Sequence, residues 1–400
     1  LYDVGNSAFV LMVATLIPIF FNALAEAGGL SSVEYLAYWG YASSAVTVIT
    51  AVLSPILGTV ADTKGFKKPI FILCVFVGIV GCCAMGAASA WLPFLVIFVI
   101  AKVGFSGSLV FYDSMLSDVT TPERMDEVSS RGYAWGYIGS CVPFVVCLGL
   151  VLGAGSIGIS QMTALNLALL LTAAWWLLTT LPLLKSYKQL YYVEVEKHAV
   201  RQSFARIGHT LRHLPEDKQV FWFLLAFFCY IDGVYTIIDM ATAYGTALGL
   251  DTTGLLLALL LTQIVAFPSA LIFGRLSNKY PSAKLIPVCI AAYAGIAVFA
   301  FFLTRQWQFW VLAVIVGMFQ GGVQALSRSH FAKIIPPEKS GEYFGLFDIC
   351  GKGASFLGTM IVSVGSQLTG SANVGVGSLI VLFIVGFVLF RVSCRQGETA

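Results

Sequence analysis

The sequence contains an internal repeat. Residues 112–139 and 327–354 align at a constant offset of 215 residues, about half of the 400-residue chain. Proline, acidic, basic and glycine positions coincide, in the pairs Pro122/Pro337, Glu123/Glu338, Arg124/Lys339, Glu127/Glu342 and Gly136/Gly351. Each copy joins two long apolar segments. The repeat therefore predicts a chain built from two similar halves.

The composition places both halves in a membrane. Hydrophobic residues make up 58% of the chain, charged residues only 11%, and the mean hydropathy is +0.88. A soluble fold of this length cannot bury so much apolar surface, so most of it must face lipid. Apolar windows of about 20 residues predict twelve helices, near 2–24, 33–61, 69–90, 91–117, 128–152, 160–184, 220–248, 252–277, 283–303, 307–334, 341–367 and 373–393. We expect an all-α integral membrane protein with two pseudo-symmetric six-helix bundles.

The expected bundles are residues 1–184 and 220–400, joined by a polar linker at 185–219. Apolar residues scattered among the linker's charges predict an amphipathic helix on the cytoplasmic membrane surface. His209 and His213 would share one face of such a helix, but no third ligand lies nearby in the sequence. A solvated helix face is favoured over a metal pair, and we predict neither a metal site nor a cofactor.

The basic residues predict the orientation. With both termini in the cytoplasm, all but three of the 23 Lys and Arg residues lie on the cytoplasmic side, as the positive-inside rule requires. Of the remaining three, Arg305 lies outside, and Lys102 and Lys352 lie within predicted helices.

A membrane protein of two similar halves is typically a transporter, because a site between the halves can face either side as they rock. Enzyme chemistry has little support. The nine cysteines show no CxxC spacing, and the sequence has neither a nucleophile elbow nor a phosphate-binding glycine loop. The chain also lacks a nucleotide-binding domain, which argues against ATP-driven pumping.

Residues 58–68 (GTVADTKGFKK) resemble the loop signature of the major facilitator superfamily, with Thr63 at a position that is usually basic. The resemblance implies a cytoplasmic gate at which the acidic residue helps to latch the outward-facing state. Asp62 can meet the positive N-terminus of a neighbouring helix, and Lys67 and Lys68 are expected to anchor at anionic lipid. Residues 274–279 (GRLSNK) are a worn copy in the second half, so we expect a one-sided latch. The predicted gate residues of this loop are Gly58, Asp62, Lys64 and Gly65.

Three further segments are similar to the vacuole-effluxer branch of this superfamily, the autophagy-related amino-acid effluxers and their bacterial relatives. They are residues 2–9 (YDVGNSAF), 232–236 (DGVYT) and 321–329 (GGVQALSRS), with FG at 344–345 and GK at 351–352. Val4 and Gly5 depart from the branch pattern. The resemblance implies a twelve-helix transporter and, for the fungal members, export of amino acids from the vacuole.

Polar residues inside the bilayer are costly and usually line a cavity or meet a partner. Here they form stripes at helical spacing. The stripes are Gln320, Gln324 and Arg328; Asp232, Thr236 and Asp239; and Asp348, Lys352 and Ser355. By resemblance to the superfamily, these stripes converge on a central cavity.

Lys352 is expected either to bind a substrate carboxylate or to close an ion pair with Asp232 or Asp348. Asp232 is a candidate proton carrier or a permanently ionised partner of Lys352, and Asp239 and Asp348 are further proton-coupling candidates. Asp3 and Asn6 are candidates for substrate contact, with a helix cap or a gate as the alternative. Lys102 is a cavity candidate that could instead snorkel outward. The substrate-binding candidates are thus Asp3, Asn6, Lys102, Asp232, Thr236, Gln320, Gln324 and Lys352.

Asp113 and Arg328 occupy equivalent repeat positions with opposite charges. They could close the cytoplasmic gate as an ion pair, or form only a surface pair. Glu127, Arg131 and Glu342 are expected in the same charge network. Three aromatic residues, Tyr133, Trp135 and Tyr137, are expected to serve packing rather than substrate stacking.

The leading hypothesis is a secondary transporter for a small polar solute, with an amino acid and proton coupling as its finer form. The alternatives are an exporter of amphipathic drugs or lipids and a transporter-derived sensor. We expect a monomer surrounded by lipid, with no nucleic-acid partner. It would lie in the plasma membrane of a bacterium or the vacuolar membrane of a fungus.

Overall fold

The computed structural model describes residues 1–194, 208–210 and 212–398, apart from the side chains of some helical residues, Lys352 among them. Apart from one isolated bridge, the regular structure of this part is helical. The N-terminal half contains α1 (Tyr2–Ala14), α2 (Leu16–Ala27), α3 (Ser32–Ala61), α4 (Lys67–Gly86), α5 (Trp91–Ser114), α6 (Leu116–Val119), α7 (Met125–Leu152) and α8 (Gln161–Ser186). The C-terminal half contains α10 (Lys218–Ala247), α11 (Thr252–Leu276), α12 (Ser282–Phe301), α13 (Gln306–Ile334), α14 (Ser340–Thr369), α15 (Ala372–Gly377) and α16 (Ile380–Glu398).

The predicted helices are found, with small changes at two of them. The first is broken at Thr15, between α1 and α2, and the last is divided into α15 and α16. In the described part of the chain, 11 helices are long and apolar enough to cross a membrane. α14 is not among these, although it is 30 residues long, and it includes residues 352–356, whose side chains are not described. The expected count of twelve is therefore close to the observed one.

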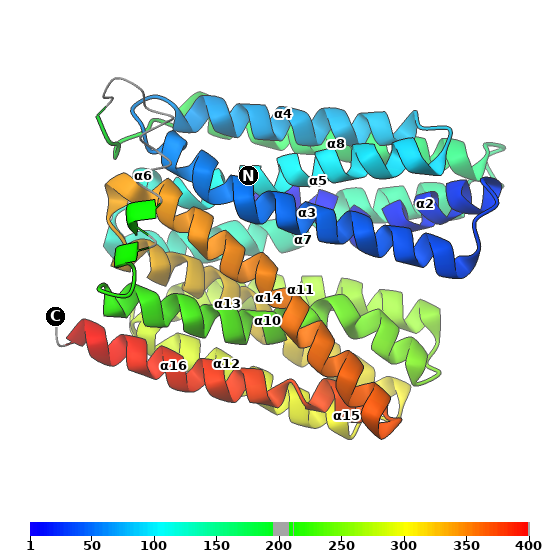
Figure 1. The fold of residues 1–400 in the computed structure, drawn as a ribbon. Helices are drawn as coiled ribbons and strands as arrows, with labels where there is room; N and C mark the ends of the chain where they lie inside the picture. Colours follow the sequence, from blue (N-terminus) through cyan, green and yellow to red (C-terminus); the bar gives the residue numbers. More distant parts are fainter. Residues whose placement is uncertain (195–207, 211, 399–400) are drawn as a thin grey trace.

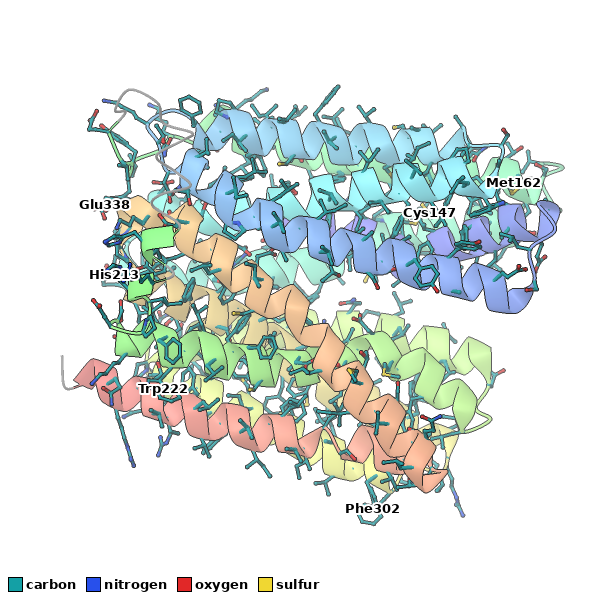
Figure 2. The ribbon with its side chains drawn as sticks, in the orientation of Figure 1. Cys147, Met162, His213, Trp222, Phe302 and Glu338 are labelled. Carbon is teal, nitrogen blue, oxygen red and sulfur yellow. The ribbon has the colours of Figure 1, made fainter. Side chains whose placement is uncertain are left out.

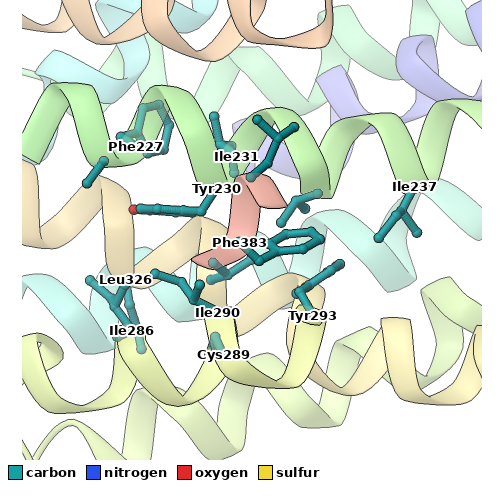
Figure 3. Close-up of a cluster of buried hydrophobic side chains, with 14 of the residues drawn as sticks. Phe227, Tyr230, Ile231, Ile237, Ile286, Cys289, Ile290, Tyr293, Leu326 and Phe383 are labelled. Carbon is teal, nitrogen blue, oxygen red and sulfur yellow. The ribbon is translucent and has the colours of Figure 1, made fainter. Parts of the chain in front are cut away.

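The two halves form separate bundles (Figure 1), with α1–α8 in one and α10–α16 in the other. Each bundle has its own core of buried side chains. In the C-terminal bundle, Tyr230, Ile290, Tyr293 and Phe383 pack between α10, α12 and α16 (Figure 3). The core positions a polar group as well, because the Tyr230 hydroxyl lies 2.6 Å from the Ser327 hydroxyl on α13.

The end of the molecule where α8 ends and α10 begins is called the linker end here. Glu338 and His213 lie at this end, and Met162 and Phe302 lie toward the other (Figure 2). The bundles meet through two helix crossings, α3 with α14 and α7 with α11, and α7 also packs on α13.

The linker differs from the expected amphipathic helix at its start. Residues 187–194 are not helical, and Val193 forms a parallel bridge with Thr63 in the α3–α4 loop. Residues 208–210, 212 and 213 are helical, and 195–207 and 211 lie outside the described residues. The cause of the difference is hydrogen bonding, because the backbone of this segment pairs with the loop instead of with itself.

Candidate functional site

A carboxylate of one half binds a helix terminus of the other at the linker end. Asp62 follows the last residue of α3, and its two oxygens accept hydrogen bonds from the backbone N–H groups of Gly341 (2.7 Å) and Glu342 (2.8 Å). These N–H groups belong to the first turn of α14, where the helix dipole favours a negative charge. Asp62, Lys67, Gly341 and Glu342 are called the α3/α14 latch below.

Lys67 is part of this latch, so the expectation that it anchors at lipid is wrong. Its side chain is 0% exposed, and its Nζ lies 3.8 Å from Asp62 Oδ1 and 3.4 Å from Asp118 Oδ2. It also donates to Ser340 Oγ at 2.9 Å. Burial raises the pKa of the Asp62 carboxyl to about 7, opposed by Lys67 and by the two amides. The latch is thus a desolvated charge pair of the N-terminal half that is hydrogen-bonded to the start of α14 in the other half.

Gly58 allows the close approach on which the latch depends. A Cβ at Gly58 would collide with the carbonyl of Gly341, and a Cβ at Gly341 would meet Asp62 Oδ1 at 2.7 Å. Any larger residue would separate α3 from α14.

The start of the linker holds the α3–α4 loop in place. Tyr187 donates to Asp118 Oδ2 at 2.6 Å, and the backbone N–H groups of Leu190 and Tyr191 donate to Asp118 Oδ1 at 3.0 Å each. The loop residues pair with the same segment: Gly65 N–H donates to Gln189 Oε1 at 2.9 Å, and Lys64 lies 3.6 Å from Glu194. Residues 187–194 are called the linker strap. Lys64 and Gly65 therefore contact the strap rather than the other half.

A second polar cluster lies between the halves and is centred on Arg328 of α13. Its Nη1 donates to Asp113 Oδ1 at 2.9 Å, and its Nε donates to Ser129 Oγ at 2.9 Å. The guanidinium lies 4.5 Å from the ring centre of Tyr133. Tyr112, 5.5 Å from the same guanidinium, donates to Asp3 Oδ2 at 2.6 Å. The two repeat-equivalent residues of opposite charge are thus brought together in a partly buried ion pair.

The α7/α11 crossing is built differently. A Cβ on Gly274 of α11 would meet the Ser130 Cβ of α7 at 2.8 Å. Asp126, in the first turn of α7, accepts from Ser329 at 2.6 Å and pairs with Lys333 at 2.6 Å, both on α13. Glu127 pairs with Arg131 on the same helix at 2.6 Å. The ion pair of Glu127 therefore lies within α7 and does not join the halves. Glu342, its equivalent in the repeat, does join them, because its backbone N–H donates to Asp62.

A cavity of about 580 Å³ lies between the halves, on the side of the Arg328 cluster away from the linker end. Lys102 of α5 and Asp239 of α10 line it from opposite halves, together with Thr236 and Gln320. The Lys102 ammonium lies 4.7 Å from the ring centre of Phe105. Most other lining residues are aliphatic or aromatic. The cavity thus combines an apolar wall with one charge of each sign, a typical arrangement for a small-molecule site.

Four other substrate-binding candidates with described side chains, Asp3, Asn6, Asp232 and Gln324, do not line this cavity. Asp3 lies in the Arg328 cluster. Asn6 is buried, and its Oδ1 lies 3.5 Å from the Oγ of Ser7. Gln324 accepts from the Tyr137 hydroxyl at 3.3 Å, one helical turn from the cavity. Lys352 belongs to α14, but its side chain is outside the described residues, as is that of Ser355.

The two remaining acidic candidates each accept hydrogen bonds from other residues. Asp232 is 0% exposed, and its Oδ1 accepts from Gly358 N–H at 2.9 Å and from Thr236 at 3.3 Å. Asp348 accepts from Ser54 of the other half at 2.9 Å. Trp135 is 55% exposed and faces away from the cavity.

Several polar residues of the interface were missed by the sequence reasoning, among them Asp118, Asp126, Ser129, Ser329 and Lys333. One signal was available for two of them, because Asp118 and Lys333 are equivalent at the repeat offset and opposite in charge, as Asp113 and Arg328 are. Ser129 carried no such signal.

Solved structures with the same fold define the class of protein. The human organic anion transporter MFSD10 superimposes with a TM-score of 0.70 at 15% identity, covering 97% of this chain and 96% of that one. The proton:xylose symporter XylE superimposes with a TM-score of 0.72 at 10% identity, covering 97% and 93%. The fold is that of the major facilitator superfamily, as the loop signature predicted.

The family follows from the sequence comparisons. Residues 1–399 match the family model described as "Vacuole effluxer Atg22 like". The chain is 42% identical to the MFS-type transporter YxiO of Bacillus subtilis (strain 168), over 100% of this chain and 94% of that protein. It is 28% identical to autophagy-related protein 22 of Saccharomyces cerevisiae (strain ATCC 204508 / S288c), over 61% of this chain and 53% of that protein. The chain belongs to the vacuole effluxer Atg22-like family. It is a multi-pass membrane protein and a secondary transporter, not an enzyme.

Proposed function

We propose that this protein carries a small zwitterionic solute, such as an amino acid, by alternating access. The observation that carries the proposal is that Lys102 and Asp239 line one cavity from different halves. A solute with a carboxylate and an ammonium group can contact both side chains at once. Because it would bridge the two bundles, its binding can be coupled to their rocking. The family description as effluxers agrees with transport of such a metabolite.

The gate in this proposal is the linker end. The α3/α14 latch and the Arg328–Asp113 pair close that end, so the solute enters the cavity from the opposite side. The distribution of basic residues supports a cytoplasmic linker end with both termini inside, and therefore a cavity that faces the outside in this state. The roles of Gly58, Glu127, Arg131 and Glu342 in this gate are part of the same proposal, as is a monomeric carrier in a plasma or vacuolar membrane.

Proton coupling is proposed through the acidic residues of α10. Asp239 is exposed to the cavity, and Asp232, two turns away, is buried. A solute ammonium and a proton would compete for Asp239, which links the two fluxes. Asp239→Asn is expected to abolish solute-dependent proton uptake into proteoliposomes, whereas Glu338→Gln, an exposed acid at the linker end, should leave it intact. Proton uptake that survives in Asp239→Asn but is lost in Asp232→Asn would move the carrier role to Asp232.

The apolar wall of the cavity favours a second candidate, an exporter of amphipathic compounds. A screen for ligand-dependent thermal stabilisation separates the two, because a ligand that binds the native state raises its stability. An amino acid should stabilise the wild type and the control Lys279→Ala, but not Lys102→Ala or Asp239→Asn. Lys352→Ala tests the alternative clamp in the same screen. If only amphipathic cations or neutral lipophiles stabilise the protein, the zwitterion proposal is wrong. Saturable flux of the stabilising compound then completes the assignment.

A further inference from the structure

A lateral pocket opens beside the α7/α11 crossing at the linker end. Its volume is about 270 Å³, and it is lined by Glu127, Arg131, Trp135, Leu271, Gly274 and Arg275. The first three belong to α7 of one half and the last three to α11 of the other. The pocket therefore exists only while the two halves are together at this end.

The pocket carries one uncompensated positive charge. Arg131 is paired with Glu127 at 2.6 Å, which leaves the pair neutral. Arg275 is exposed, and no ion pair to it occurs among the described residues. A single cation beside a neutral ion pair attracts an anion, and the guanidinium's parallel N–H groups match two oxygens of a phosphate.

The surroundings of the pocket are suited to lipid. Trp135 is 55% exposed, and its ring is tilted against that of Phe267, with 5.5 Å between ring centres. Trp135 lies in the half of α7 nearer the linker end, about three turns from its first residue, where its exposed ring can lie against lipid. Seven residues further into the membrane on the same helical faces lie two exposed aliphatic residues, Val142 (55%) on α7 and Ile264 (46%) on α11. They extend the polar pocket into an apolar surface on which acyl chains can lie.

We propose that this pocket binds the phosphate of an anionic phospholipid, with Arg275 as its principal ligand. Arg131 would contact the same headgroup from the other half, and the acyl chains would cover Trp135, Val142 and Ile264. A lipid bound there connects α7 with α11, between which the described residues form no ion pair. It therefore stabilises the state that is closed at the linker end. The inference does not depend on which solute the cavity carries.

The test uses the full chain in nanodiscs of phosphatidylcholine, with or without phosphatidylglycerol. The wild type should retain phosphatidylglycerol in native mass spectrometry and unfold at a higher temperature when that lipid is present. In Arg275→Ala the apparent affinity for phosphatidylglycerol should fall about fivefold, the effect of one basic side chain near an anionic surface. In Arg275→Lys the apparent affinity for phosphatidylglycerol should fall less, because the positive charge remains. Lys279→Ala, an exposed basic residue just beyond α11, is the matched control and should behave as the wild type.

Inorganic phosphate added to phosphatidylcholine nanodiscs separates a lipid site from a free-anion site. We expect no stabilisation beyond that of chloride at equal ionic strength. Stabilisation by phosphate equal to that by phosphatidylglycerol would overturn the lipid assignment. Equal losses in Arg275→Ala and Lys279→Ala would overturn the site itself, because they would show only diffuse attraction to the anionic surface.

Discussion

The two crossings that join the halves occupy related positions but use different chemistry. At α3/α14, a carboxylate caps a helix N-terminus and a fully buried lysine compensates its charge. At α7/α11, Gly274 packs on Ser130, and the counterpart of Asp62 in the worn copy of the loop is the exposed Asn278. The repeat thus supplies two similar contacts, but a buried carboxylate binds the crossing helix itself only at α3/α14, whereas the buried Asp126 of α7 pairs with Lys333 of α13. This difference makes the α3/α14 side the stronger lock on the closed linker end.

The largest expected effect is that of removing the carboxylate of the latch. Asp62→Ala leaves two helix N–H groups without their acceptor and Lys67 with Asp118 alone. Breaking a buried pair in this way costs about 3 kcal/mol, so the equilibrium should shift toward a state open at the linker end. Spin labels at Phe66 and Glu338, both exposed, report this opening as a longer distance in nanodiscs.

Asn278→Ala is the matched control at the other crossing. We expect a shift within about 0.5 kcal/mol, the usual range for an exposed substitution. If both variants open the linker end equally, the latch is not the stronger lock and the comparison fails.

The second effect concerns the two glycines. Gly58→Ala places a Cβ against the backbone of Gly341, which cannot move without displacing α14, and should cost about 2 kcal/mol. Gly274→Ala meets a side chain instead, so the double variant Gly274→Ala/Ser130→Gly should recover most of its loss. Thermal unfolding of the four proteins, wild type included, measures both. Failure of Ser130→Gly to restore stability would show that α7/α11 is limited by backbone contact as well.

Hydropathy and the internal repeat were sufficient to predict the fold from the sequence. Long apolar runs depend on local sequence, so nearly every spanning helix could be located before the structure was known. The break at Thr15 was not predicted from hydropathy, although Pro18 three residues later removes a helical hydrogen bond and is a local signal for such a break.

The site was less predictable because its partners come from distant segments. Lys67 lies in a basic cluster typical of a membrane surface. Its burial is explained by its contacts with Asp118 and Ser340, which are distant in the sequence but adjacent to it in the fold. Asp239 belongs to one stripe and Lys102 to none, and only the packing of the bundles puts them on one cavity. Arg328 and Asp113 were paired correctly as candidates because the repeat compared equivalent positions directly.

The smallest expected effect comes from loosening the linker strap. Among the described residues, the strap contacts the α3/α14 side and not the α7/α11 side, so this effect also distinguishes the two crossings. Tyr187→Phe removes one hydrogen bond to Asp118, which keeps the amides of Leu190 and Tyr191 and the charge of Lys67. A loss of about 1 kcal/mol is expected, seen as faster hydrogen exchange at residues 190–193. Tyr191→Phe is the control, because that residue contacts Asp118 through its backbone only. If exchange rises equally in both variants, the hydroxyl of Tyr187 does not hold the strap, and the asymmetry of the crossings rests on Asp62 and Lys67 alone.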